Sequence, residues 1–323
     1  MKRFSRLGGL LVSLLFLAAA GGAVFFRQDI LDWWALRSYT PPAEVQQLAD
    51  QGTVTKYARR IFYASHPAVE DSAPFNQHCN QHAEKTIVLG CYDGRYIYVY
   101  NVTDQRLNGV KQVTAMHEML HAIYQRLSPS ERTKVDSEVE AQFKSMNDAH
   151  INELVAEYQK SEPGEVDNEL HSILGTEVGG LSPDLETYYT KYFTNRQAVV
   201  SFANQYESAF TDSQKKIATI DAQLASLQSQ IDQNQKTLAA QQTVLDAESA
   251  RMSSLRSSGS VDTYNAAVAP YNAKVQAYNG LIADTKQLVA QYNSLVETRN
   301  ALATAHNNLA QSLNSSLQAL PAQ

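Results

Sequence analysis

The sequence predicts an α+β domain that follows a membrane-spanning segment and precedes a long antiparallel α-helical coiled-coil hairpin. An uncharged apolar run near the N-terminus, two strand-like segments before a helical segment, and a heptad pattern in the C-terminal third indicate this order. We therefore expect an anchor and juxtamembrane stretch over residues 1–38. A globular domain follows over residues 39–200, and the hairpin occupies residues 201–323.

The apolar run extends from Leu7 to Phe26 and follows a basic N-terminal flank. About 20 apolar residues are enough to cross a bilayer as a helix, and a basic flank stays on the cytoplasmic side. We expect an uncleaved anchor, with Trp33 and Trp34 in the outer interfacial belt and the rest of the chain outside the cytoplasm, in a bacterial cell envelope. A cleaved signal peptide is the alternative, because small residues at 18–23 offer a cleavage point.

The chain contains two cysteines, Cys79 and Cys91, in a region expected to face an oxidising compartment. An even number of cysteines in such a compartment indicates a disulfide. Metal ligation by this pair is the weaker alternative, because their spacing fits no common zinc pattern. The formal net charge of -6, without a basic patch, argues against nucleic acid as a partner.

A β-hairpin is predicted in the globular domain. Residues 86–92 and 95–102 are rich in β-branched and aromatic side chains, and the Asp-Gly pair at 93–94 favours a tight turn between them. Tyrosines alternate on one face of the second strand, namely Tyr96, Tyr98 and Tyr100. These rings either line a substrate cleft or pack against a neighbouring helix.

The next segment, predicted to be helical over 109–127, contains the HExxH sequence His117-Glu118-Met119-Leu120-His121. Residues four apart share one face of a helix, so His117 and His121 can bind the same metal ion. The Glu118 carboxylate is rotated away and can reach a water at the metal without being a ligand. Two imidazoles and an open position suit Zn²⁺. A buried helix with two hydrogen-bonded histidines is the alternative.

This motif and its uncharged surroundings resemble the zincin metallopeptidases over about residues 85–180. The resemblance implies a zinc-dependent peptidase in which Glu118 is the general base that activates water. It also implies that an edge strand beside the metal pairs with an extended peptide substrate.

The resemblance further implies a third ligand on a later helix. Zincins of the gluzincin type take a glutamate there, with a small residue three positions on, and Glu169 with Ser172 matches this arrangement. Position 173 departs from it: several gluzincin families have an acidic residue there that orients a histidine, and this chain has Ile173. Glu177 is the competing ligand, and His171 is a weaker one.

A zincin site also needs a group that stabilises the oxyanion of the tetrahedral intermediate. The sequence offers several candidates without choosing between them, namely His171, Tyr188, Tyr189 and Tyr192. Between the two halves of the site, Ser128-Pro129-Ser130-Glu131 predicts a capped helix that continues to about Lys160.

The C-terminal third is rich in Gln, Asn, Ser and Ala, with sparse apolar residues at heptad spacing from Ile217 to Leu255. Residues 257–260 break this pattern. A second arm then carries leucines seven apart from Leu281 to Leu309, with a recurring Tyr-Asn pair. We expect the two arms to pack within one chain, with the tyrosines inside. Self-association through the tyrosines, or binding of another coiled-coil partner, is the alternative.

These patterns predict a membrane-anchored, extracytoplasmic zinc peptidase that acts on a protein or peptide substrate. The alternative is a cell-envelope scaffold in which the coiled coil is the functional part and the metal-binding domain is structural or inactive. Glu118 favours the enzyme, because an inactive site has no need of a base.

Overall fold

The computed structural model describes residues 26–79 and 88–315, which form two compact units. The first unit comprises the described residues up to Ala209 and again from Leu309, and the second comprises Phe210–Asn308. Of the apolar run Leu7–Phe26 that is predicted to span the membrane, only Phe26 is among the described residues. The first two residues of the predicted β-hairpin, 86 and 87, also lie outside them. In the part of the chain that is described, no helix combines the length and apolar character needed to cross a membrane.

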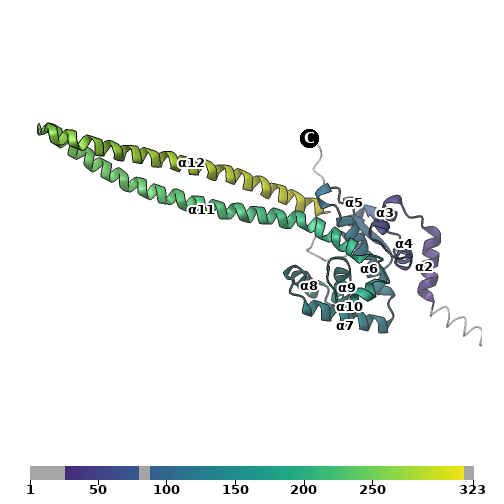
Figure 1. Cartoon of the computed structure of the whole chain (residues 1–323). Coiled ribbons are helices and arrows are strands. Elements are labelled where there is room, and N and C mark those ends of the chain that lie inside the picture. The colour runs from purple at the N-terminus through teal and green to yellow at the C-terminus, as the bar shows by residue number, and fades with distance from the viewer. Residues whose placement is uncertain (1–25, 80–87, 316–323) are drawn as a thin grey trace, which may run out of the picture. The chain divides into compact units, whose positions relative to one another are not determined.

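The first unit is mainly helical, with one small sheet (Figure 1). Its helices are α2 (Arg27–Ser38), α3 (Ala43–Gln51), α4 (Lys56–Ala64), α5 (Ser72–His78), α6 (Val110–Arg126), α7 (Pro129–Ser145), α8 (Ala149–Ser161), α9 (Val166–Thr176) and α10 (Pro183–Tyr189), with the short 3-10 helix η1 (Gln105–Leu107). The strands are β1 (Ala68–Glu70), β2 (Gly90–Tyr92) and β3 (Ile97–Tyr100). This composition agrees with the predicted α+β class, although a zincin fold does not follow from it.

The sheet has the order β1-β3-β2. The predicted hairpin is present as the antiparallel pair β2 and β3, in which Cys91 lies opposite Tyr98. The second strand begins two residues later than predicted because the turn takes up residues 93–96, where Asp93 Oδ1 accepts hydrogen bonds from the backbone of Arg95 and Tyr96. Strand β1, which runs parallel to β3, is only three residues long and has no alternation that would predict it.

The two faces of β3 pack against different partners. Ile97 and Val99 join the main core around α6. Tyr98 and Tyr100 lie on the opposite face, where the Tyr98 ring stacks on His78 at 4.2 Å and the Tyr100 ring lies 5.5 Å from Phe75, both from α5. These tyrosines therefore pack against a helix and do not line a cleft over α6. The predicted disulfide between Cys79 and Cys91 is present beside them.

Helix α6 forms the centre of the core and matches its predicted bounds within one residue at each end. Its N-cap, Gly109, has φ of 104°, a conformation that residues other than glycine rarely adopt. Large apolar side chains of α6 are completely buried, namely Met116, Met119, Leu120 and Ile123. The helix packs against both α9 and the sheet, so its side chains can meet groups from two directions.

Helix α7 begins with the predicted capping box, in which the side chains of Ser128 and Glu131 each bind the other's backbone. The predicted helix to about Lys160 is broken, however, because the chain leaves the helical conformation at residues 146–148 before α8 begins.

The second unit is an antiparallel hairpin made from most of α11 (Arg196–Ser257) and α12 (Val261–Leu313), which run side by side (Figure 1). Arg299 pairs with Asp221 at 2.9 Å, and Lys274 pairs with Glu248. Seam residues are buried within this single chain, among them Ile220, Ile231 and Leu245. The predicted boundary at residue 200 falls inside α11, whose first turns belong to the first unit.

Candidate metal centre

The two histidines of the HExxH sequence meet Glu169 in the first unit. One ligand atom from each of His117, His121 and Glu169 lies within 4.8 Å of the other two. Nε2 of His117 is 3.4 Å from one carboxylate oxygen of Glu169, and Nε2 of His121 is 3.5 Å from the other. The three side chains are between 10% and 16% exposed. The arrangement can hold a divalent metal ion.

Small residues on α9 allow this meeting. A Cβ added at Gly175 would lie 2.4 Å from a methyl carbon of Leu120 and 2.8 Å from the ring of Tyr189. Ser172, one turn earlier on α9, is fully buried and its hydroxyl lies 3.3 Å from Nδ1 of His121. The close approach of α9 to α6 therefore depends on small side chains at Ser172, which the sequence indicated, and at Gly175.

Asn168 orients His121. Its side-chain oxygen lies 3.0 Å from Nδ1 of His121, and its amide donates a hydrogen bond of 2.9 Å to Glu165. A proton on Nδ1 leaves Nε2, the nitrogen that faces Glu169, with its lone pair available for a metal. Asn168 thus fills the orienting role expected at position 173, where Ile173 is instead buried in the core. Asn168 was not among the predicted site residues, because a neutral amide before Glu169 carries no recognisable pattern.

The Glu169 carboxylate is held as an anion in a buried position. Burial raises its pKa, but the charge of His121, the close approach of His117 and a hydrogen bond from Tyr158 outweigh burial, and the pKa lies below its usual value. Within the described residues, its buried Oε2 accepts no well-aligned hydrogen bond. A buried carboxylate oxygen without a donor is costly, and a metal ion between it and the imidazoles removes that cost.

Glu118 lies on α6 beside strand β2 and is 6% exposed. A Cβ added at Gly90, the first residue of β2, would lie 2.7 Å from a carboxylate oxygen of Glu118 and 2.5 Å from Thr114. The strand can approach the carboxylate only because residue 90 is glycine. This contact places the Glu118 side chain between α6 and an edge strand.

The other candidates lie away from the ligand group. Glu177 is the C-cap residue of α9, two turns beyond Glu169. His171 is completely buried, with Nε2 at 2.9 Å from the hydroxyl of Tyr188, and its pKa is lowered to about 3, first by burial and then by the charges of His121 and His117. It is a neutral core residue.

The tyrosines proposed for the oxyanion are also core residues. The hydroxyl of Tyr189 donates to the backbone oxygen of His171 at 2.6 Å, and that of Tyr192 donates to Tyr188 at 3.3 Å. All three are at most 8% exposed. Tyr158 of α8, which the sequence analysis did not consider, contacts Glu169 and is only partly buried. It is the tyrosine that this geometry brings to the site.

Comparison of the chain with protein-family models, with curated proteins and with solved structures finds no match. The resemblance to zincins therefore rests on the motif residues of the sequence.

Proposed function

We propose that the protein is a zinc-dependent peptidase, attached by its N-terminal segment to the extracytoplasmic face of a membrane. The observation that carries the proposal is the convergence of His117, His121 and Glu169 from two helices, with Glu118 on the same helix as the histidines. Two imidazoles and one carboxylate are a donor set that catalytic zinc sites use.

His117, His121 and Glu169 would hold the zinc, which would supply the Lewis acidity that polarises a peptide carbonyl and makes water acidic near neutral pH. The Glu118 carboxylate accepts a proton from the attacking water and delivers it to the nitrogen of the cleaved bond. Asn168 keeps the proton of His121 on Nδ1 throughout. Burial of the ligands by α6 and α9 limits access of bulk water and strengthens these electrostatic effects.

Strand β2 is the proposed site of the substrate backbone. It forms one edge of the described sheet, and an extended peptide can add to such an edge through backbone hydrogen bonds. Because Gly90 places this strand against Glu118, a peptide bound there would lie near the base. The class of substrate that fits is an extended segment of a protein or peptide.

The test is metal content and peptide hydrolysis by the purified full chain. We expect about one zinc per chain, lost in His121→Ala and Glu169→Ala and retained in Glu118→Gln. Hydrolysis of a fluorogenic peptide library should fall at least about 100-fold in Glu118→Gln, the usual scale for loss of a general base. Glu177→Ala is the matched control, because it removes a nearby carboxylate outside the ligand group, and it should keep both metal and activity.

Two results would contradict the proposal. A folded chain that binds no metal would contradict the metal site, and full hydrolysis by Glu118→Gln would contradict the role of Glu118 as the base. Bound zinc without any hydrolysis would instead favour the envelope scaffold, in which the hairpin is the functional part. Replacing Phe210–Asn308 with a short linker distinguishes the peptidase from the scaffold. A peptidase should keep its hydrolysis without the hairpin, whereas a scaffold should lose its function.

A further inference from the structure

Helix α2 is unusual for a surface helix because it buries a carboxylate and exposes large apolar residues. The one residue of α2 that is buried is the carboxylate-bearing Asp32. Its outward side carries large apolar residues that are between 43% and 61% exposed, namely Ile30, Leu31, Trp33 and Trp34, and Phe26 just before it is 54% exposed. A helix on a water-soluble domain normally buries its apolar side and exposes its charges.

This exposure is concentrated in one place. Among the described residues of the first unit, the exposed large hydrophobic residues are the five at positions 26–34 and Tyr57 of α4, a helix that packs against α2. An apolar patch of this kind on an otherwise ordinary surface marks a contact with a partner or a membrane.

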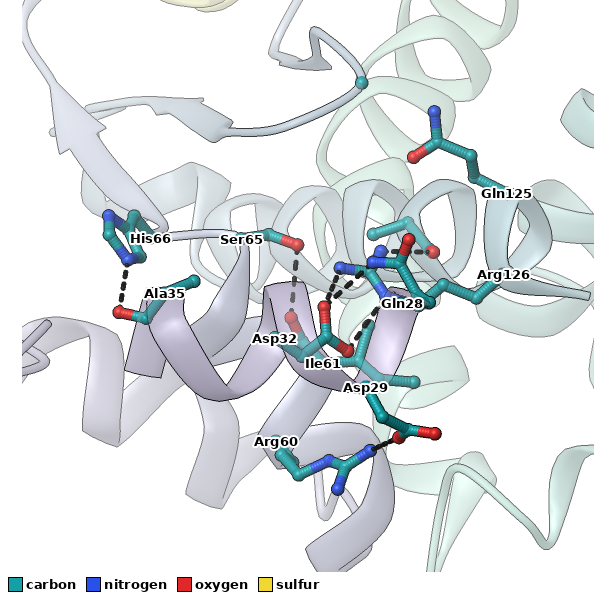
Figure 2. A network of polar contacts seen from close by, with 12 residues as sticks. Gln28, Asp29, Asp32, Ala35, Arg60, Ile61, Ser65, His66, Gln125 and Arg126 are labelled. Atoms are coloured by element: carbon teal, nitrogen blue, oxygen red, sulfur yellow. Dashed lines mark hydrogen bonds and ion pairs between the residues drawn. The ribbon is translucent and has the colours of Figure 1, made fainter. Parts of the chain in front are cut away.

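Polar contacts made by other residues of α2 fix the helix with its apolar residues exposed, and Figure 2 shows these contacts. Asp32 accepts hydrogen bonds from Arg126 at 2.8 Å and from Gln28 at 2.9 Å. Asp29 pairs with Arg60, and the backbone oxygen of Ala35 lies 2.9 Å from Nε2 of His66. Turning the tryptophans inward would break these contacts. Their exposure is therefore built into the fold.

The occupant that fits this side is the interfacial zone of a lipid bilayer. The apolar run predicted to span the membrane ends at Phe26, immediately before α2, so the helix would emerge at the headgroup level. Tryptophan favours that zone because its ring is apolar and its N–H needs a polar partner. Arg27 and Arg37 flank the tryptophans, and their cations suit lipid phosphates.

We propose that α2 lies along the bilayer surface with Trp33 and Trp34 among the lipid headgroups, as a membrane contact additional to the spanning segment. This contact fixes the orientation of the domain on the membrane, because Asp32 joins α2 to Arg126, the last residue of the HExxH helix. The inference rests on the membrane attachment in the proposed function and is independent of its chemistry.

Tryptophan fluorescence tests the proposal directly, since the chain contains two tryptophans and both are on α2. The full chain is reconstituted into phosphatidylcholine–phosphatidylglycerol vesicles, and integration is checked by alkaline extraction. We expect blue-shifted emission, strong quenching by lipids brominated near the headgroup, and several-fold weaker quenching by aqueous iodide than for free tryptophan. The matched control is Val261→Trp in a Trp33→Phe, Trp34→Phe background, because Val261 is 65% exposed in the second unit. Iodide should quench that tryptophan fully.

Three results would overturn the proposal. Integrated chain with iodide-accessible tryptophans would place α2 in water and leave the anchor intact. Tryptophans shielded from both iodide and brominated lipid would indicate a protein partner, and dependence of that shielding on the protein-to-lipid ratio would identify a second copy. Extraction of the chain from the vesicles would contradict the membrane attachment as well as the position of α2. Measurements of metal content and hydrolysis would not reveal this result.

Discussion

The two buried carboxylates beside α6 differ in how well they are satisfied. Asp32 of α2 lies beside the C-terminal end of α6 and accepts hydrogen bonds from two nitrogens of Arg126 and from Gln28. Glu169, beside the middle of the helix, faces two imidazoles and has a buried oxygen without a hydrogen bond from the described residues. A satisfied buried pair holds elements together, whereas an unsatisfied one is a site that gains from a ligand.

The largest effect is expected at the satisfied pair. Asp32→Ala leaves the Arg126 guanidinium buried without its carboxylate, and the side chains are 5% and 10% exposed. We expect the free energy of unfolding to fall by about 3 to 5 kcal/mol, measured by urea unfolding. The double variant Asp32→Leu, Arg126→Met should recover most of this loss. An equally unstable double variant would show that shape, not charge, matters here.

The metal should stabilise the unsatisfied site by mass action. At a zinc concentration 100-fold above Kd, a ligand that binds the folded state alone adds about 2.7 kcal/mol. Thermal unfolding of the chelated chain with and without added zinc measures this term. The unfolding temperature of Glu169→Ala should not change when zinc is added. Asp32→Asn should unfold at a lower temperature than the wild type but show the same increase with zinc. A similar shift in Glu169→Ala would contradict the assignment of the ligand.

The approach of α9 to α6 can be tested separately from the charges. Gly175→Ala places a methyl group in the contact with Leu120 and Tyr189, and we expect a loss of about 1 to 3 kcal/mol from overpacking, together with weaker zinc binding. Gly180→Ala is the control, because nothing lies within 4 Å of its added Cβ. If Gly175→Ala left the zinc affinity unchanged, the zinc site would not depend on this packing contact.

The smallest effect concerns the carboxylate of Asp104, which pairs with the exposed side chain of Arg106. Hydrogen bonds from Arg106 and Ser312 lower the pKa of Asp104 to about 2. Because the folded-state pKa lies below the unfolded value, the stabilisation is complete above about pH 4 and is lost as the pH falls toward 2. The Arg106 side chain is 52% exposed, so we expect Asp104→Asn to cost under about 1 kcal/mol at pH 7. The difference from the wild type should shrink in unfolding curves recorded at low pH.

Local patterns predicted the parts of this molecule that local physics controls. The bounds of α6, the capping box at Ser128 and the turn at 93–96 depend on neighbouring residues, and each is present. The pair His117 and His121 follows from helical spacing alone. The disulfide followed from the compartment expected for the chain.

Other features depend on packing between distant segments. The alternation of Tyr98 and Tyr100 fixes one face of β3 but not which helix covers that face. The sequence left Glu169 and Glu177 as alternatives. In the structure Glu169 lies with His117 and His121, whereas Glu177 is the C-cap residue of α9, two turns further along. No spacing rule predicts the contacts of Asn168 and Tyr158 with the site, because these contacts arise from the approach of α9 to α6 and of α8 to α9.

The hairpin is an insertion within a domain. The first unit contains residues on both sides of Phe210–Asn308, and its final segment supplies the buried residues Leu309 and Leu313 and a hydrogen bond from Asn76 to the backbone of Ser315. A growing chain therefore synthesises the whole hairpin before residues 309–315 can complete the domain that contains His117, His121 and Glu169. Completion of that domain waits for the hairpin, although most of its residues are made first.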